Sequence, residues 1–545
     1  MNEREFNLLD EPWIIVLNFD GSTEKVSLID ALARSAEFRG LAGELPTQDA
    51  AILRLLLAVL HTVIARCGPS DNKDEHKPIT DPLMALDCWK ELWNAGSFPM
   101  ESIRAYLEKY HDRFYLFDPE RPFFQVPNIN GKSTVFEAQK LNGEICESGH
   151  KPRLFSPRSG KPKEELEYDE AARWLVHVNS YSDSAFKDKD SKQDNRIGVG
   201  WLGKVGLVMA EGDTLFKTLM LNLILLKDGE DELWGDEKPI WENESVRTAK
   251  NMLVSAPSSL SELYTFQSRR IIIPHNEKVT EVKIAGGEAF EIEDALVEQM
   301  TLWKGSKKRG TLYKPRTHDA SKQMWRNFAA LLSLHDSQTQ RCPGIVKWHA
   351  RLAYEGILPN GIIRLRATAL QYDSNNSSTV ECYTDNMEFS GKILEEKGEK
   401  WVQTVIDSVK IADKLAERAG YLAQKIAEAC GARARGGKED DFGKTAGEIA
   451  KERAYSALDM PFRSWLAGIG TEHEKPTDAK ERWWNTAQPI IRRLGKDIIA
   501  QAGPQAFVSK TVKGKYVSGV ERYNDFLYCT KSWQTLMNGG KKSGK

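Results

Sequence analysis

The chain has 545 residues, 41% of them hydrophobic and 28% charged, which is the composition of a globular protein of about two to four domains. Its net charge of −2 excludes a wholly basic protein, so any nucleic-acid-binding surface must be local. The seven cysteines form no CxxC pair, which argues against a zinc ribbon or a disulfide framework and is typical of a reducing cytoplasm.

The first part of the chain predicts strands followed by a long helix. Residues 7–16, NLLDEPWIIV, lead into a turn, a second strand and the start of a short helix. A long helix is expected from Pro46 to Arg66, with Thr47 as its N-cap. Its most apolar window, residues 50–65, is too short and too polar to span a bilayer. The N-terminus lacks an apolar signal core, and we therefore expect a cytoplasmic protein.

Two basic stretches contain no acidic residue. The first, GHKPRLFSPRSGKPK at 149–163, has five lysines or arginines and one aromatic residue, Phe155, and its prolines and glycines disfavour a helix. The second, KGSKKRGTLYKPRT at 304–317, has six lysines or arginines. A basic loop with an exposed ring can stack on a base and hold phosphates, but it can equally be a solvated loop, and the residues leave both interpretations open.

The chain carries no convincing enzyme motif. GVGWLG at 198–203 matches GxGxxG, but a polar segment precedes it and a strand-like one follows, so no dinucleotide site is expected. His-Asp dipeptides at 111–112, 318–319 and 335–336 raise the possibility of an HD-type metal-dependent nuclease. That chemistry needs further clustered ligands, and the ten histidines are scattered. We expect no enzymatic activity, no catalytic residues and no cofactor.

Residues 264–287, YTFQSRRIIIPHNEKVTEVKIAGG, predict a β-hairpin. A β-branched run and an alternating segment are joined by a short turn that contains proline and asparagine. Arg269 and Arg270 lie at the root of this hairpin and Lys278 lies at its tip. A two-stranded arm with a cation at its tip suits a nucleic-acid groove, although an ordinary surface hairpin has the same features.

The last part of the chain changes from strands to helices. Residues 361–383 predict two strands joined by the polar loop DSNNSS at 373–378. From Trp401 to Ile426 apolar residues recur at spacings of three and four, as on one face of a helix. Three further amphipathic segments follow at 442–468, 477–501 and 515–536. Four helices joined by loops suggest a four-helix bundle.

Several of these stretches together resemble one family, CasA, the large subunit of the type I-E CRISPR Cascade complex. The resemblance rests on NLLDEPWIIV followed by VSLIDAL, on RLLLAVL, on FYLFDPERPFFQ, on YTFQSRRIII and on the helical C-terminal third. It covers most of the chain in the expected order. It implies an α+β fold with a large, irregular, mixed N-terminal domain that carries the β-hairpin arm (residues 1–390), and a C-terminal four-helix bundle with a basic tail (residues 391–545).

The resemblance also implies a function. The family holds the 5′ handle of the crRNA and recognises the protospacer-adjacent motif in double-stranded target DNA. It promotes duplex opening and R-loop formation, and recruits the helicase-nuclease in antiviral defence. The expected partners are crRNA, target DNA, the backbone, handle-binding and small subunits of Cascade, and the helicase-nuclease, with no membrane. Some members carry a cysteine-rich insertion in the hairpin that can bind zinc; it is absent here, so we expect no metal.

Two DNA-contacting elements of the family match residues of this sequence. The family places a lysine from the hairpin in the minor groove, and Lys278 is the matching residue. The family also inserts a glutamine from a wedge loop beside the motif. The matching loop contains Asn375, Asn376 and Ser377, and Asn376 takes the place of the glutamine with a side chain one methylene shorter.

Two further elements match less closely. In the family an aromatic residue before a basic loop contacts the crRNA handle, which corresponds to Phe155 with Arg158 and Lys161. The family's glycine-rich loop, whose backbone approaches the motif, falls where this chain has SDSAFK and no glycine, so Ala185 and Phe186 are the candidates.

Two alternative functions remain. The HD-type nuclease predicts metal-dependent, chelator-sensitive DNA cleavage by the isolated protein. A pure scaffold predicts that the bundle binds partner subunits and that the hairpin never contacts DNA.

Overall fold

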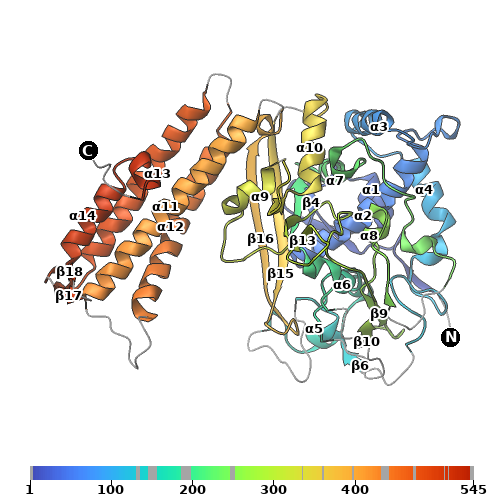
Figure 1. Cartoon of the computed structure of the whole chain (residues 1–545). Helices are drawn as coiled ribbons and strands as arrows, with labels where there is room; N and C mark the ends of the chain where they lie inside the picture. The colour runs from blue at the N-terminus through green and yellow to red at the C-terminus, as the bar shows by residue number, and fades with distance from the viewer. Residues whose placement is uncertain are drawn as a thin grey trace. The chain divides into compact units, whose positions relative to one another are not determined.

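The computed structural model divides the chain into two compact units, which are described separately (Figure 1). The first comprises Met1–Lys322, Ala330–Pro359 and Arg364–Asn386, and the second comprises Gln323–Ala329, Asn360–Ile363 and Met387–Lys545. The described residues are 4–129, 135–144, 156–185, 198–245, 252–333, 335–358, 361–395, 398–430, 441–470, 474–508, 510–512 and 515–539.

The first unit mixes strands with helices, as the expected α+β fold requires. Its helices are α1 (Leu28–Ala33), α2 (Pro46–Cys67), α3 (Pro82–Ala95), α4 (Met100–Lys109), α5 (Lys161–Glu164), α6 (Tyr168–Tyr181), α7 (Leu215–Asn222), α8 (Leu260–Tyr264) and α10 (Gly344–Tyr354). Helix α9 (Phe328–Leu332) begins in a segment of the second unit.

The strands form several small sheets rather than one large one. The sheet orders are β1–β5, β3–β2–β4, β6–β10–β9, β11–β8, β13–β12–β14 and β16–β15–β7. Their bounds are β1 Glu5–Asn7, β2 Ile14–Leu17, β3 Thr23–Val26, β4 Gly40–Leu41, β5 Tyr115–Phe117, β6 Val135–Glu137, β7 Leu207–Glu211, β8 Met252–Leu253, β9 Arg269–Ile272, β10 Glu281–Gly286, β11 Glu288–Ala289, β12 Leu302–Gly305, β13 Tyr313–Arg316, β14 Gln340–Arg341, β15 Ile362–Tyr372 and β16 Thr379–Ser390.

Helix α2 is the central core helix of the first unit. By length and composition it is apolar enough to cross a membrane, which corrects the expectation that it is too short and too polar to do so, but 83% of its most apolar window is buried inside the protein. Pro46 occupies the first helical position, which suits its fixed φ and missing N–H, so Leu45 is the N-cap. The prediction that Thr47 caps this helix is wrong. The Thr47 hydroxyl lies within the first turn, where it bonds the ring of His177 at 3.1 Å.

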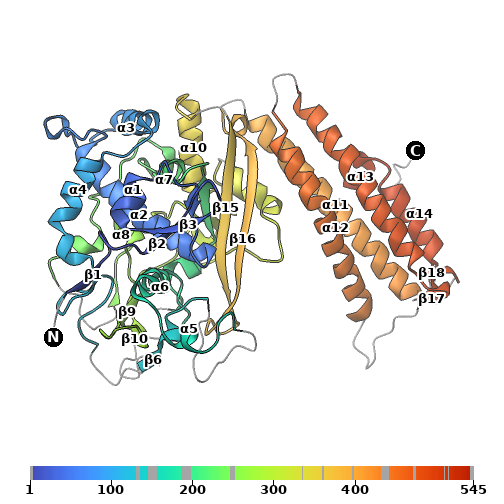
Figure 2. The same ribbon diagram turned by 180° about the vertical axis from the view of Figure 1, so that it is seen from behind.

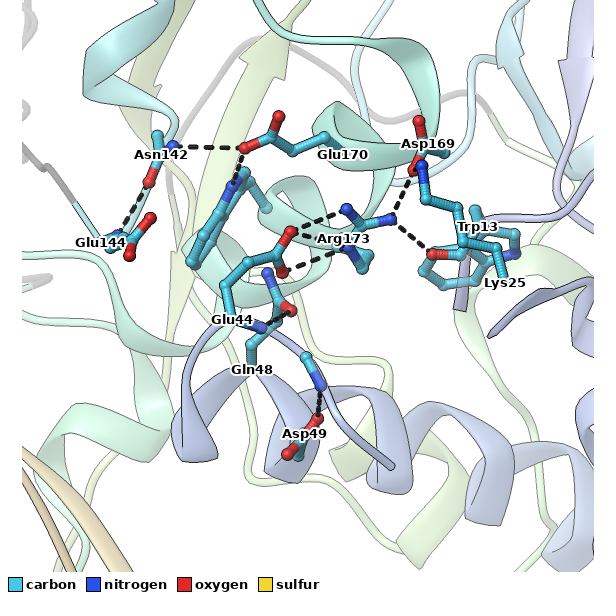
Figure 3. A network of polar contacts seen from close by, with 12 residues as sticks. Trp13, Lys25, Glu44, Gln48, Asp49, Asn142, Glu144, Asp169, Glu170 and Arg173 are labelled. Carbon is cyan, nitrogen blue, oxygen red and sulfur yellow. Dashed lines mark hydrogen bonds and ion pairs between the residues drawn. The ribbon is translucent and has the colours of Figure 1, made fainter. Parts of the chain in front are cut away.

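A buried arginine holds the N-terminal motif against α6 (Figure 3). The Arg173 side chain is only 3% exposed and forms ion pairs of 2.7 Å with both Glu44 and Asp169. It also donates to the carbonyl of Trp13 at 2.7 Å, and Asp169 pairs with Lys25. Burial alone would raise the pKa of Glu44, but the hydrogen bonds and charge of Arg173 lower it. Arg173 of α6 therefore holds this helix against both the NLLDEPW motif and the start of α2.

A second buried ion pair connects α2 to the sheets. Arg54 donates to both carboxylate oxygens of Glu298, at 2.9 and 3.0 Å, and its guanidinium lies 4.2 Å from the centre of the Tyr264 ring. Glu298 also accepts the indole N–H of Trp201 at 2.8 Å. Trp201 lies in the GVGWLG segment, which leads through a short 3-10 helix into β7. Because β7 pairs with β15 in an antiparallel sheet, this segment does not begin a dinucleotide-binding unit.

The second unit contains the predicted helical bundle. Its elements are α11 (Glu399–Ala429), α12 (Asp441–Ala467), α13 (Pro476–Ala500), α14 (Gly519–Cys529), α15 (Trp533–Met537), β17 (Lys510–Val512) and β18 (Lys515–Val517). Helix α11 packs against α12, α13 and α14. The fourth predicted helix is divided into α14 and α15.

Aromatic residues form the core of this bundle. Phe462 of α12 packs edge-on against Trp483 of α13, with ring centroids 4.9 Å apart. Trp325 stacks on Phe462 at 4.3 Å and donates its indole N–H to Asp459 at 2.8 Å. The short segment around Trp325, which we expected in the N-terminal domain, therefore belongs to the second unit.

Replacing Arg54 should strongly destabilise the first unit. In Arg54→Met, Glu298 would remain buried without its cationic partner, and losing one partner of a buried ion pair costs about 3–5 kcal/mol. The measurement is the free energy of unfolding in urea, followed by tryptophan fluorescence, for the transition that includes this unit.

The matched control is Arg34→Met. Arg34 also pairs with two carboxylates, Glu24 and Glu37, but at the surface, and its loss should cost less than about 1 kcal/mol. Adding Glu298→Gln to Arg54→Met should recover part of the loss. Equal stability of the two single variants would contradict this account.

Candidate nucleic-acid interface

The predicted hairpin is confirmed. Strands β9 and β10 pair antiparallel, with Ile271 opposite Ile284 and Ile272 opposite Lys283. Val282 and Ile284 are buried and Lys283 is partly exposed, as the alternation predicts. A third strand, β6, pairs with the other edge of β10. Figures 1 and 2 show this sheet at the same end of the first unit as α5 and the turn between β15 and β16.

The tip of the hairpin is attached to the segment that precedes α6. Leu166 and Val279 exchange backbone hydrogen bonds of 2.9 and 3.0 Å, which makes an isolated antiparallel bridge. The hydroxyl of Tyr168 also donates to the carbonyl of Asn276 in the turn. The tip is therefore held in a defined position and does not project as a free arm.

Lys278 lies at this tip and is paired with acidic residues. Its ammonium donates to the Glu167 carboxylate at 2.7 Å and lies 3.9 Å from Glu165. The hydrogen bond and charge of Glu167 raise the pKa of Lys278. The lysine side chain is still 46% exposed, so it remains accessible to a ligand.

Lys278 shares a groove of about 820 Å³ with the described part of the first basic stretch. The charged residues that line this groove are the basic Arg158, Lys161 and Lys278 and the acidic Glu165, Glu167, Glu170 and Glu277. The hairpin lysine and two of the three predicted crRNA-handle residues are thus brought together. The third, Phe155, lies outside the described residues.

The two basic residues of this stretch have different surroundings. Arg158 is partly buried and pairs with Glu170 at 2.6 Å and with Glu144 at 3.1 Å. Glu170 also accepts from Asn142, as Figure 3 shows, so Arg158 is tied to a network of side chains. Lys161 is exposed at the first residue of α5 and forms no ion pair with any residue that the structure describes.

The predicted polar loop is a tight turn between β15 and β16. The Asp373 carboxylate accepts the backbone N–H of Ser377 at 2.6 Å and the hydroxyls of Ser377 and Ser378 at 2.9 and 3.1 Å. The backbone hydrogen bond from Ser377 is the main cause that lowers the pKa of Asp373 to about 2. Asn376 has a φ of 55°, which asparagine tolerates better than most residues. Asn375 and Asn376 are both exposed at the top of the turn.

The segment that replaces the glycine-rich loop lies against this turn. The backbone N–H and the hydroxyl of Ser184 both donate to the carbonyl of Asn376 at 2.7 Å, and the hydroxyl also reaches the carbonyl of Asn375 at 3.2 Å. Ala185 donates its N–H to the Asp183 carboxylate at 2.9 Å. Two predicted sites, Ala185 and the Asn375–Ser377 turn, are thus neighbours. Phe186 lies outside the described residues.

Arg269 connects the hairpin to this second group, a role that the sequence analysis missed. Its side chain donates to the carbonyls of Asp183 and Gly198 at 2.7 and 2.6 Å, and the residue is only 1% exposed. Arg270 is also buried and donates to the carbonyl of Gly286. Two adjacent arginines in a sequence are typical of an exposed surface. No neighbouring residue indicated that the segment around Asp183, which is distant in the sequence, would bury them.

The His-Asp dipeptides do not form a metal centre in the part of the chain that is described. Within it, no three His, Cys, Asp or Glu side chains are close enough together to hold an ion. His318 is buried, its ring bonds the carbonyl of Leu207 at 2.9 Å, and burial lowers its pKa to about 4.

Comparison with known proteins agrees with the resemblance seen in the sequence. The family model for CRISPR-associated protein Cse1 matches residues 7–494. CRISPR-associated protein CasA/Cse1 of Thermus thermophilus is 28% identical over 484 residues, which cover 86% of this chain and 88% of the relative. The crystal structure of Thermobifida fusca Cse1 matches with 30% identity and a TM-score of 0.80 over 98% of both chains.

Cse1 from Acidimicrobium ferrooxidans matches with 25% identity and a TM-score of 0.77, over 97% of this chain and 99% of that one. The predicted resemblance is confirmed along nearly the whole length of the chain. The chain therefore belongs to the CRISPR-associated Cse1 (CasA) family, the large subunit of the type I-E Cascade surveillance complex.

Proposed function

We propose that this subunit recognises the protospacer-adjacent motif in double-stranded target DNA, and that it does so with one end of its first unit. The observation that carries the proposal is the convergence of distant segments. Lys278, Arg158 and Lys161 line one groove, and Ala185 lies beside the turn of Asn375 and Asn376. Both groups lie at the same end of the first unit (Figures 1 and 2).

The groove suits contact with a DNA minor groove. The Leu166–Val279 bridge and the Tyr168 hydrogen bond hold the hairpin tip, so the Lys278 ammonium is presented at a fixed place. A lysine donor in the minor groove distinguishes A·T from G·C pairs only partly, which suits recognition of a set of related motifs. Base pairing with the crRNA would then provide the remaining specificity.

The Asn375–Asn376 turn suits duplex opening. Asp373 accepts hydrogen bonds from within the turn, and Ser184 donates to its carbonyls. The backbone that carries the exposed amides of Asn375 and Asn376 is therefore held rigid. Separating a base step costs a few kcal/mol, and an inserted side chain must offset this cost. A turn that is already ordered loses little conformational entropy when it inserts.

The remaining roles in this proposal concern the crRNA and the other proteins of the complex. Lys161 and Arg158 bind the crRNA handle, the bundle contacts other Cascade subunits, and the opened target recruits the helicase-nuclease, in the cytoplasm. The subunit itself needs no catalytic residues for these roles.

Lys278→Ala should reduce motif discrimination by a reconstituted, crRNA-loaded complex. We expect the ratio of affinities for targets with correct and scrambled flanks to fall about tenfold, as for the loss of one base contact. Binding is measured by electrophoretic mobility shift at fixed salt concentration.

The matched control is Lys283→Ala, which removes the same charge from β10 but does not change a residue that lines the groove. This variant should keep the wild-type ratio. If Lys278→Ala also keeps it, the pure-scaffold alternative becomes the better account.

Asn376→Gly should slow R-loop formation on duplex targets but not on targets that are already open. Glycine keeps the positive φ of this position and removes only the amide side chain, whereas alanine would strain the turn. The rate is measured with a fluorescent base analogue beside the motif, on a duplex and on a pre-melted bubble. Equal slowing on both substrates would indicate a general folding or binding defect instead of a lost wedge.

A further inference from the structure

The Lys278–Glu167 contact is built into the backbone. In an antiparallel pair, the residue after Leu166 lies opposite the residue before Val279, which places Glu167 opposite Lys278. Leu166 and Val279 are both fully buried. Because side chains alternate along extended chain, Glu167 and Lys278 point outward together. The ion pair is therefore a cross-strand pair fixed by register rather than a chance contact of two mobile side chains.

The charges of the residues that line the groove do not favour the binding of a polyanion such as DNA. Its four acidic residues outnumber its three basic residues. Arg158 is already paired with Glu144 and Glu170, and Lys278 is paired with Glu167. A surface selected only for tight DNA binding would lack carboxylates at these places, because each one repels phosphates.

We propose that Glu167 is a specificity-determining residue, which cancels the attraction of Lys278 for phosphates while leaving its hydrogen-bond donors available to neutral base edges. An ammonium has three N–H donors, and Glu167 takes one of them. The remaining two can reach minor-groove acceptors, because nearly half of the lysine side chain is exposed. This inference rests on the proposed role of Lys278 in motif recognition.

Glu167 should change the ratio between sequence-independent binding to phosphates and position-dependent binding to bases. An unpaired lysine binds any phosphate, and this sequence-independent binding raises the affinity for every duplex. A lysine paired with a carboxylate has little net charge, so phosphates gain little from it, whereas hydrogen bonds to bases depend on position and remain. Glu167 should therefore lower the affinity for wrong targets more than the affinity for correct ones. Glu165, at 3.9 Å, adds to the same effect.

The test is Glu167→Gln in the reconstituted, crRNA-loaded complex. Glutamine keeps the size and an oxygen acceptor but removes the charge, and the site is exposed, so folding should be unchanged. We expect the affinity for targets with scrambled flanks to rise about two- to fivefold, the usual size of an exposed ion pair, with a smaller rise for correct targets. The slope of log affinity against log salt between about 50 and 200 mM should become steeper by up to about one unit.

The matched control is Glu277→Gln, which removes one negative charge from the same groove but has no ion pair with Lys278. It should raise the affinity for both targets equally. In a Lys278→Ala background the effect of Glu167→Gln on discrimination should disappear, whereas the equal rise in affinity for both targets that Glu277→Gln causes should persist.

The outcomes separate this inference from the proposed function. If Lys278→Ala lowers discrimination but Glu167→Gln behaves like wild type or like Glu277→Gln, the role of Glu167 is refuted and motif recognition stands. If Glu167→Gln instead weakens binding to correct targets, the carboxylate only orients the lysine and the inference is also refuted. If Lys278→Ala changes nothing, the proposed function itself fails.

Discussion

The first unit depends on the buried guanidinium of Arg173. A buried charge without partners costs several kcal/mol, so Glu44, Asp169 and the Trp13 carbonyl must all lie around it. This requirement fixes the position of helix α6 relative to Glu44 and Trp13 (Figure 3). Glu167 directly precedes α6 and the Ser184–Ala185 segment follows it. Both parts of the candidate interface are therefore attached to the two ends of one fixed helix.

Arg269 connects the same two parts a second time. It lies at the root of the hairpin and binds the carbonyl of Asp183, whose neighbour Ser184 holds the Asn376 carbonyl. The hairpin lysine and the asparagine turn thus belong to one continuous hydrogen-bonded framework. In the proposed function the subunit recognises a short motif and opens the duplex beside it, and this requires a constant separation between these two elements.

Local patterns predicted the elements of this framework but not their partners. Alternation identified the hairpin, DSNNSS identified the turn, and helical periodicity identified the bundle. The sequence could not show that Lys278 meets Glu167, 111 residues away, or that Ser184 meets Asn376, 192 residues away. The burial of Arg269 and Arg270 was missed for the same reason, since covering segments are distant in the chain. The proposed roles of all the predicted site residues stay predictions, and Phe155 and Phe186 lie outside the described residues.

We propose that target DNA lies against this end of the first unit. A photoreactive phenylalanine in place of Glu277, an exposed residue of the groove, would test it directly in the crRNA-loaded complex. The control position is exposed Lys90 on α3, at the opposite end of this unit (Figures 1 and 2). We expect crosslinks from position 277 to nucleotides of the flanking motif and none from position 90. The absence of crosslinks from position 277, or crosslinks spread evenly along the duplex, would rule out this placement of the DNA.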